Sequence, residues 1–195
     1  TKAEASLAVL QAAKEGLDAV IVCPTGVIGP YDYRKSEMGS LLLEFMKNTP
    51  TVLIDGSYDF VDVRDVARGH VLAGEKGRRG EVYILSGERI RLTTLKALVN
   101  EKTNRRNPSI KLPLSLAMFV ANFTPFFYRM TRIKAKFTRY SLETVMGNSN
   151  FSCNKAQTEL GYKARSLEHT VDDTLRWFMD NQKLFKKRRI LAVKK

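Results

Sequence analysis

Apolar residues recur along the first half of the chain with two different periods. In the first helix-length segment they fall three or four positions apart, at Leu7, Leu10 and Ala13. This spacing predicts an amphipathic helix that ends near Gly16. The run DAVIVC that follows, residues 18–23, is continuously apolar and of strand length, which is typical of a parallel strand buried on both faces.

The alternation of helices and strands continues to about residue 102. We expect strands at 51–55, 58–63 and 81–87 and helices at 36–47 and from Thr93 onward. The segment NEKTNRRNPSIKLP then forms a polar connection. Beyond it the pattern is mainly helical, and we expect helices at 114–130, 141–146, 152–160 and 166–185.

Asp62 and Asp65 stand where the helix in VRDVARGHVLAGEKG begins. Carboxylates at the N-cap and in the first turn stabilise a helix N-terminus, so we interpret both as capping residues. We expect the inward face of this helix, with the His70 ring packed on it, to consist of Val66, Ala67, His70 and Val71.

The net charge of +13 belongs to the second half of the chain. Residues 1–100 contain 13 Lys/Arg and 13 Asp/Glu, whereas residues 101–195 contain 20 and 7. Seven of these cations follow Asp180, in a tail that is either a solvated end or a contact for anionic lipid or nucleic acid. No helix-turn-helix, zinc-finger or RNA-recognition pattern accompanies the charge, so we do not expect nucleic-acid binding.

The number and spacing of the cysteines and histidines argue against a disulfide-rich protein and against a metal-binding one. Cys23 and Cys153 are too few and too scattered for a disulfide framework or a Cys-rich metal site, which indicates reduced thiols and a cytoplasmic setting. His70 and His169 each lack a second ligand at a suitable spacing. We therefore expect no metal site.

Five motifs in a fixed order carry a resemblance to a known family. TKAEA enters the first helix, and PTGVIGP, YDFVDVRDVARGHVLAGEKG, YILSGE and finally NKAQTELGY with SLEHTVDDTLRWF follow. Together they resemble the C-terminal portion of an extended short-chain dehydrogenase/reductase. The most similar branch is the dihydroflavonol-reductase-like part of the NAD-dependent epimerase/dehydratase family.

The resemblance implies an α/β fold and a division of the chain. Residues 1–102 would form the C-terminal half of a Rossmann-type doubly wound parallel sheet, which binds NAD(P) and has substrate-loop segments interleaved. Residues 103–185 would form a mainly helical substrate-binding region, and residues 186–195 a basic tail.

The resemblance assigns Lys2 a catalytic and cofactor-binding role. In this family a catalytic tyrosine lies four residues before a lysine, a spacing that puts both side chains on one helical face. A tyrosine with a pKa of about 10 is a poor base at neutral pH, so a neighbouring cation is needed. If Lys2 is that cation, the tyrosine lies before Thr1 with two residues between them, and the glycine-rich phosphate loop is also outside these residues. We expect the 195 residues alone to be inactive, and whether they are a natural fragment is left open.

The loop Pro24, Thr25, Gly26, Val27 and Ile28 follows a parallel strand at its carboxyl end, where ligands of open α/β sheets bind. The resemblance implies that backbone amides of this loop bind the nicotinamide carboxamide of NAD or NADP. A plain Pro/Gly turn is the alternative.

Tyr31, Tyr33 and Arg34 follow directly and would border the substrate. The two aromatic rings could pack on a flat or apolar molecule and Arg34 could meet an anion, or the segment could be an exposed polar turn. Arg139 lies where some nucleotide-sugar relatives place a diphosphate-binding arginine.

The apolar region 114–128 also has two interpretations. Pro113, Asn122 and Pro125 interrupt it, so we reject a transmembrane helix. It forms either core-facing helices or a hydrophobic rim for a lipid-like substrate. In the second case the basic tail would favour peripheral contact with an anionic membrane.

We therefore expect an NAD(P)-dependent oxidoreductase that acts on a carbonyl or alcohol of a small-molecule substrate. The alternatives are a nucleotide-sugar epimerase or dehydratase, in which the cofactor is not consumed, and a non-catalytic basic binding protein. The resemblance further implies a homodimer that forms through the helix containing Lys2.

Overall fold

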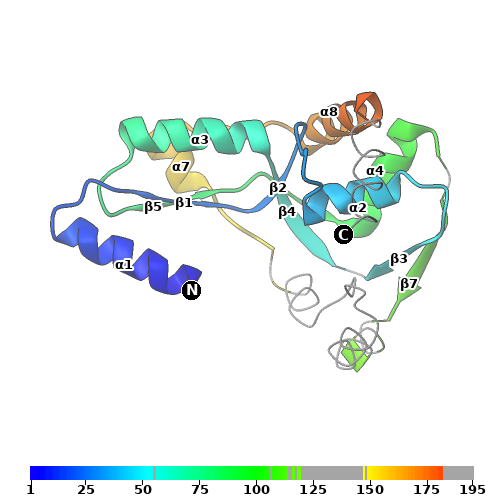
Figure 1. Ribbon diagram of the computed structural model, residues 1–195, viewed down its shortest axis with the longest axis horizontal. Helices are drawn as coiled ribbons and strands as arrows, with labels where there is room; N and C mark the ends of the chain where they lie inside the picture. Colours follow the sequence, from blue (N-terminus) through cyan, green and yellow to red (C-terminus); the bar gives the residue numbers. More distant parts are fainter. Residues whose placement is uncertain are drawn as a thin grey trace, which may run out of the picture. The chain divides into compact units, whose positions relative to one another are not determined.

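The computed structural model describes residues 1–54, 56–105, 107–113, 116, 118, 119, 147 and 149–181 (Figure 1). The chain forms two compact units. Unit 1 comprises Thr1–Ser40, Asp59–Glu88 and Phe151–Lys195, and unit 2 comprises Leu41–Tyr58 and Arg89–Asn150.

Two parallel strands form the centre of unit 1. β1 (Ile21–Pro24) pairs with β5 (Val82–Leu85) in parallel, with Ile21 opposite Val82. In Figure 1, α3 (Val63–Lys76) lies above this strand pair and α1 (Lys2–Lys14) below it. Parallel strands between helices are the arrangement expected of an α/β fold, which is thereby confirmed.

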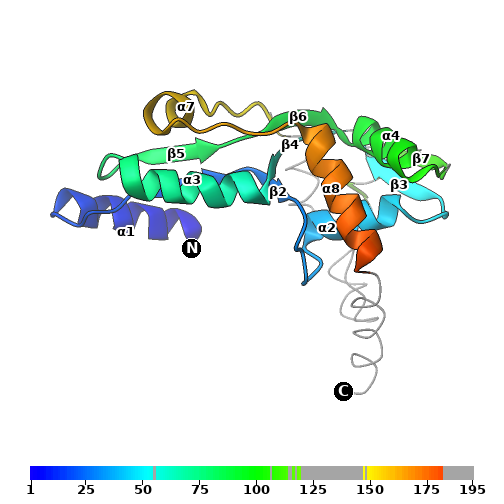
Figure 2. The same ribbon diagram turned by 90° about the horizontal axis from the view of Figure 1, so that it is seen from above.

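The core of unit 1 lies between α3, β5 and α7 (Asn154–Leu160), and in the view of Figure 2 β5 runs between α7 and α3. Its buried side chains are Val61, Val66, Ala73, Tyr83, Leu85, Ala156, Leu160 and Tyr162. Their burial provides the main stabilisation of this unit, at roughly 1.5–3 kcal/mol for each large aliphatic side chain.

The first helix is present as predicted, but little of its apolar face is covered. Thr1 is the N-cap and forms a capping box with Glu4. Ala13 is buried, whereas Leu7 is 67% exposed. The expectation that β1 is buried on both faces was wrong, since Cys23 is exposed. Among the described residues β1 has one neighbouring strand, β5, so its second edge is open.

The inward face of α3 differs from the predicted one. Asp65, Val66, Gly69 and Ala73 are buried, whereas Ala67, His70 and Val71 are exposed. The sequence of this helix offers two apolar stripes. The stripe next to Asp65 is the buried one, because the Asp65 carboxylate binds Arg165, 100 positions away in sequence. The His70 ring is not packed inward; its Nδ1 lies 2.8 Å from the Val66 carbonyl oxygen of the preceding turn.

A second sheet has the strand order β2-β4-β6. β2 (Gly26–Ile28) pairs in parallel with β4 (Ser57–Asp62), and β6 is Glu88–Arg91. β2 lies within PTGVIGP, which the sequence indicated to be a loop because proline and glycine flank it. β6 was not predicted either, because its side chains are mostly exposed and follow no apolar pattern.

Unit 2 contains a third parallel pair, β3 (Thr51–Ile54) with β7 (Ser109–Leu112), and α4 (Leu92–Thr103) packs on β3 through buried Leu95 and Val99. β7 lies inside the segment predicted to be a polar connection. Most of its side chains are exposed, so the strand is held by backbone pairing and gives no hydrophobic signal.

Two helices begin at the serine predicted from the sequence. The Ser36 hydroxyl accepts a hydrogen bond from the Gly39 amide at the start of α2 (Glu37–Phe45), and Ser166 is the N-cap of α8 (Leu167–Asp180). None of the described helices combines the length and apolar character needed to cross a membrane. The helices expected at 114–130 and 141–146 and the basic tail 186–195 lie outside the described residues, apart from isolated positions near 116–119.

Lys96 in α4 is an unusual buried cation of unit 2. Its side chain is 1% exposed, and its ammonium donates to the Pro108 carbonyl at 3.0 Å and to the Ser109 hydroxyl at 2.8 Å. Desolvation lowers the pKa of Lys96 below its ordinary value. The negative charge of Glu44 acts in the opposite direction and offsets part of this decrease.

We predict that Lys96 makes unit 2 more stable as the pH rises toward 10.5. Between the lowered folded pKa and the unfolded pKa, the unfolded chain binds more protons than the folded one, so the free energy of unfolding increases with pH. Lys96→Met should remove this contribution. Urea unfolding of both proteins between pH 7.5 and about 10.5 should give curves that diverge with pH; parallel curves would contradict the prediction.

Candidate functional site

The predicted cofactor segment 24–28 runs from the end of β1 into β2. Thr25 at the junction is fixed by two hydrogen bonds. Its hydroxyl donates to the Asp59 carboxylate at 2.6 Å, and its amide donates to the Leu85 carbonyl at 3.2 Å. Both donors of Thr25 are used inside the protein, so a ligand would have to be met by other amides of the segment.

Asp59, in the middle of β4, joins the carboxyl ends of β1 and β5. It is 5% exposed, and the oxygen that accepts from Thr25 also accepts from the Gly87 amide at 3.0 Å. A Cβ at Gly87 would lie 2.1 Å from the Phe60 carbonyl oxygen, so only glycine allows this close approach of β4 and the end of β5. The carboxyl ends of β1 and β5 therefore meet beside the middle of β4, and the carboxyl ends of parallel strands are where such sheets bind ligands.

The turn at residues 31–36 follows β2 and is held by side chains. The Asp32 carboxylate accepts hydrogen bonds from the amide and the hydroxyl of Ser36, each at 2.8 Å. Tyr31 and Lys35 have positive φ values of 73° and 54°. Such conformations cost non-glycine residues roughly 1–3 kcal/mol each and are enriched at ligand sites.

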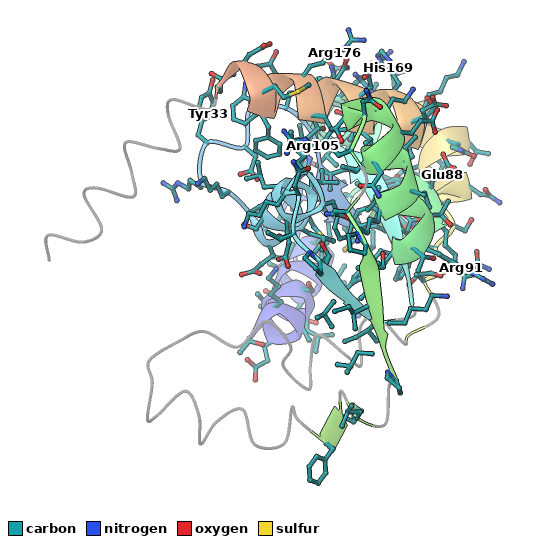
Figure 3. All side chains as sticks on the ribbon, turned by 90° about the vertical axis from the view of Figure 1, so that its right-hand side faces the viewer. Tyr33, Glu88, Arg91, Arg105, His169 and Arg176 are labelled. Atoms are coloured by element: carbon teal, nitrogen blue, oxygen red, sulfur yellow. The ribbon has the colours of Figure 1, made fainter. Side chains whose placement is uncertain are left out.

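The two tyrosines of this turn contact α8. The Tyr33 ring lies 5.2 Å from the Trp177 ring at an interplanar angle of 88°, and Tyr31 lies 6.2 Å from it at 64°. Both are edge-to-face contacts. Figure 3 shows Tyr33 beside α8. Tyr31 and Tyr33 remain 60% and 53% exposed, so both rings are available to a ligand.

Among the described residues, no hydrogen bond, ion pair or ring contact joins Lys2 or Arg34 to this arrangement. Lys2 is the exposed first residue of α1, and no hydrogen bond or ion pair among the described residues involves its ammonium. Arg34 is exposed on the turn. Arg139 lies outside the described residues, as does nearly all of the region 114–128.

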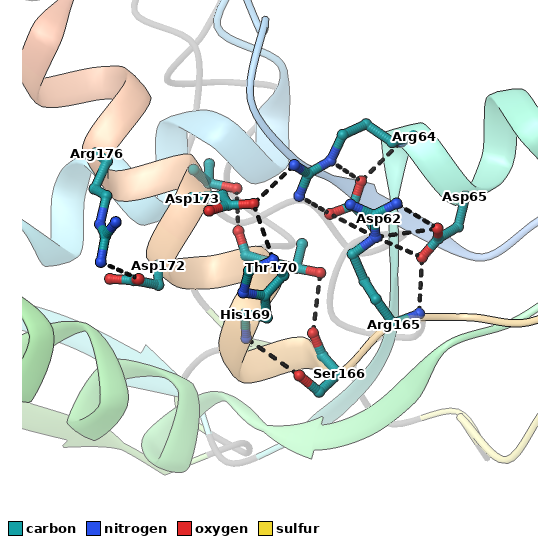
Figure 4. Close-up of polar contacts among 11 residues, drawn as sticks. Asp62, Arg64, Asp65, Arg165, Ser166, His169, Thr170, Asp172, Asp173 and Arg176 are labelled. Carbon is teal, nitrogen blue, oxygen red and sulfur yellow. Dashed lines mark hydrogen bonds and ion pairs between the residues drawn. The ribbon is translucent and has the colours of Figure 1, made fainter.

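Sequence reasoning missed a cluster of buried charges at the start of α3 (Figure 4). The Asp62 side chain is fully buried and accepts from the backbone amide of Arg64 at 2.8 Å and from its guanidinium at 2.9 and 2.7 Å. The same guanidinium reaches Asp173 of α8 at 2.7 Å. Arg64 therefore links the start of α3 to α8.

Asp65 binds a second arginine. It accepts from the Arg165 guanidinium at 2.7 and 3.0 Å and from the Arg165 amide at 2.8 Å. The two residues are 100 positions apart in sequence. The capping spacing of Asp62 and Asp65 was visible in the sequence and is confirmed, since Asp62 is the N-cap of α3 and Asp65 lies in its first turn. Nothing in the sequence indicated Arg165.

The protonation of the cluster follows from its contacts. Burial alone would raise the pKa of Asp62, but hydrogen bonds from the Arg64 side chain and backbone and from Thr170 lower it overall. The hydrogen bond to Asp62 raises the pKa of Arg64, and the hydrogen bond to Asp65 raises the pKa of Arg165. The cluster is thus a set of charged pairs at neutral pH.

Metal chemistry has no visible support in the part of the chain that the structure describes. No group of three or more His, Cys, Asp or Glu side chains there could hold an ion. The exposed Cys23 and the half-buried Cys153 are both free thiols.

Comparison with known proteins shows which family and which proteins the chain is similar to. Residues 1–86 match the NAD dependent epimerase/dehydratase family. Sterol demethylase protein B of Methylococcus capsulatus is 30% identical over 92% of this chain and 56% of its own length. A putative dihydroflavonol 4-reductase of Synechocystis is 29% identical over 88% of this chain and 51% of its own length.

A solved structure gives the same result for the fold. The crystal structure of gox2253 superimposes with a TM-score of 0.74 at 32% identity, covering 91% of this chain and 54% of that one. The chain thus spans about half the length of the relatives it matches. The fold is a Rossmann-like α/β fold, as the similarity to this solved structure shows. More particularly, the chain is related to the NAD-dependent epimerase/dehydratase family, whose characteristic sequence occupies residues 1–86.

We predict that Arg165→Met lowers the free energy of unfolding by about 2–3 kcal/mol, because it leaves the buried Asp65 charge with fewer donors. The value lies below the range for fully buried pairs because the Arg165 side chain is 31% exposed. Arg176→Met is the matched control. Arg176 pairs with Asp172 at 2.8 Å and is 68% exposed, so its loss should cost less than about 0.5 kcal/mol. Equal urea midpoints for both variants would contradict a structural role for Arg165.

Proposed function

We propose that this chain forms part of an NAD(P)-dependent oxidoreductase that reduces a carbonyl, or oxidises an alcohol, on a flat and largely apolar small molecule. The observation that carries the proposal is the position of residues 24–28. They lie at the carboxyl end of parallel strands within the part of the sequence that matches the NAD-dependent family.

The described residues fit a nicotinamide at this edge. Hydrogen bonds from Thr25 to Asp59 and Leu85 fix the backbone of the segment, and Gly87 allows the strands to meet without a side chain in the way. β2 is the edge strand of its sheet, so alternate amides of Gly26–Ile28 point away from β4. These amides would bind the carboxamide. When bound, the nicotinamide supplies or accepts a hydride at C4.

Lys2 would act on a tyrosine one helical turn before it. Its ammonium would favour the tyrosinate form and donate to the ribose hydroxyls of the cofactor. An exposed position at the first residue of α1 leaves the ammonium available for both contacts.

The substrate would lie against the turn at residues 31–36. The exposed Tyr31 and Tyr33 rings provide a surface for a flat molecule, and Arg34 would bind an anionic substituent. Arg139 would add a second cation. A sterol protein and a dihydroflavonol reductase stand among the relatives, and this supports a polycyclic substrate.

Two further contacts belong to the same proposal. The exposed Leu7 on α1 fits a homodimer that forms through this helix, because pairing of two copies would cover it. The region 114–128 and the basic tail would touch an anionic membrane while the enzyme remains in the cytoplasm.

The test measures oxidation of NADPH and NADH at 340 nm with a dihydroflavonol and with a 3-keto sterol. It uses the protein at the length found in its source cells. Lys2→Ala should lower kcat by roughly 10²–10⁴-fold, the usual contribution of acid–base catalysis. Lys14→Ala, at the other end of α1, is the matched control and should retain the wild-type kcat.

Wild-type kcat in Lys2→Ala would remove the catalytic role of Lys2. Conversion of a nucleotide sugar without net oxidation of NAD(P)H would replace the oxidoreductase by the epimerase or dehydratase alternative. The absence of cofactor binding, with DNA binding that weakens steeply as salt increases, would favour the non-catalytic alternative.

A further inference from the structure

The N-terminal half of α8 is anchored to the rest of unit 1. Ser166 caps the helix, and the Asp173 carboxylate lies 2.7 Å from the Arg64 guanidinium, which is itself bound to the buried Asp62. Because Asp62 is the N-cap of α3, the position of α8 along its own axis is tied to the start of α3 (Figure 4).

One turn beyond this anchor, the same helix contacts the turn at residues 31–36. Asp173 and Trp177 are four residues apart, so their side chains lie on one face of α8. Trp177 is half-buried and makes edge-to-face contacts with Tyr31 and Tyr33. One face of α8 therefore binds Arg64 through Asp173 and, one turn later, contacts Tyr31 and Tyr33 through Trp177.

The next residue of α8 fixes the other end of this turn. Phe178 is fully buried, and a Cβ at Gly39 would lie 3.2 Å from its ring and 1.9 Å from the Asp32 carboxylate. The first turn of α2 is thus packed between α8 and Asp32, which binds Ser36. Both ends of the segment from Tyr31 to Gly39 are held by α8.

We propose that α8 positions the substrate turn, with Trp177 holding Tyr31 and Tyr33 in their ligand-binding geometry and the Arg64–Asp173 pair keeping Trp177 in register. Trp177 and Asp173 are then positioning residues that set the affinity for substrate and leave cofactor affinity unchanged. The proposal rests on the substrate role given above to Tyr31 and Tyr33. It adds two residues near the far end of the chain that the sequence did not connect with substrate.

Steady-state kinetics separate substrate affinity from cofactor affinity. With a dihydroflavonol or a 3-keto sterol, Trp177→Leu and Asp173→Asn should each raise the substrate KM roughly tenfold, the scale of one lost aromatic contact. The KM for NAD(P)H should stay within about twofold. Trp177→Phe, which keeps an aromatic ring, should restore most of the substrate affinity.

Two substitutions on α8 are matched controls. Asp172→Asn removes the neighbouring carboxylate, which pairs with Arg176 on the same helix, and Met179→Ala shortens an exposed apolar side chain. Both should leave the substrate KM unchanged. Equal changes of the substrate KM in Asp172→Asn and Asp173→Asn would mean that any loss of charge on α8 has this effect, and would overturn the proposal.

A second readout needs no turnover. Trp177 is the only tryptophan of the sequence, so the tryptophan fluorescence of the protein comes from this residue alone. Acrylamide should quench it more strongly in Asp173→Asn than in the wild type or in Asp172→Asn, because the indole is no longer held against the tyrosines. Unchanged quenching in Asp173→Asn would overturn the positioning by the ion pair.

The two readouts distinguish the possible failures. If the wild type oxidises no NAD(P)H with any substrate but Asp173→Asn still exposes Trp177, the proposed function fails and the positioning of the turn by α8 stands. If the wild type is active and neither Trp177→Leu nor Asp173→Asn changes the substrate KM, the proposed function stands and this inference fails.

Discussion

A buried carboxylate has to be paired with donors, because an unpaired charge inside a protein costs several kcal/mol. The short segment from β4 into α3 contains three such groups, Asp59, Asp62 and Asp65, which are 5%, 2% and 4% exposed. Each meets the requirement with its own partners, which are distant in sequence for Asp59 and Asp65 and two residues away for Asp62. Asp59 binds Thr25 and Gly87, Asp62 binds Arg64, and Asp65 binds Arg165.

This pairing explains how unit 1 is built from segments far apart in sequence. Apolar packing of α3 and α7 on β5 provides most of the stabilisation, but it is not directional. The carboxylates add direction, because each accepts hydrogen bonds from defined positions. They fix the end of β1, the end of β5 and the start of α8 relative to one strand–helix junction. The proposed cofactor segment and the substrate turn are both attached to these fixed points.

Local signals predicted the described helices well. Asp62, Ser166 and Gly161 cap or end a helix through contacts a few residues away, so a short stretch of sequence contains the information. The strands β6 and β7 escaped prediction because their side chains are largely exposed and their pairing uses the backbone. A periodic pattern records burial, and strands without a buried face leave none.

The same distinction between local and long-range signals applies to the residues of the candidate site. The segment 24–28 and the tyrosines of the turn follow a strand that could be located in the sequence, so their position at a sheet edge could be predicted. The partners Arg165, Asp173 and Trp177 could not, because a contact across a hundred residues or more leaves no mark on local spacing. The prediction of the buried face of α3 was wrong for the same reason, because that face is set by the binding of Arg165 to Asp65.

The central claim is that residues 24–28 form the nicotinamide edge of a cofactor site. Titration of the ¹⁵N-labelled native-length protein with NADH and NADPH, followed by amide chemical shifts, tests it most directly. The account predicts saturable shifts that are largest at Gly26, Val27 and Ile28, with small changes in β3 and β7. Saturable binding that leaves these three amides unmoved would contradict it.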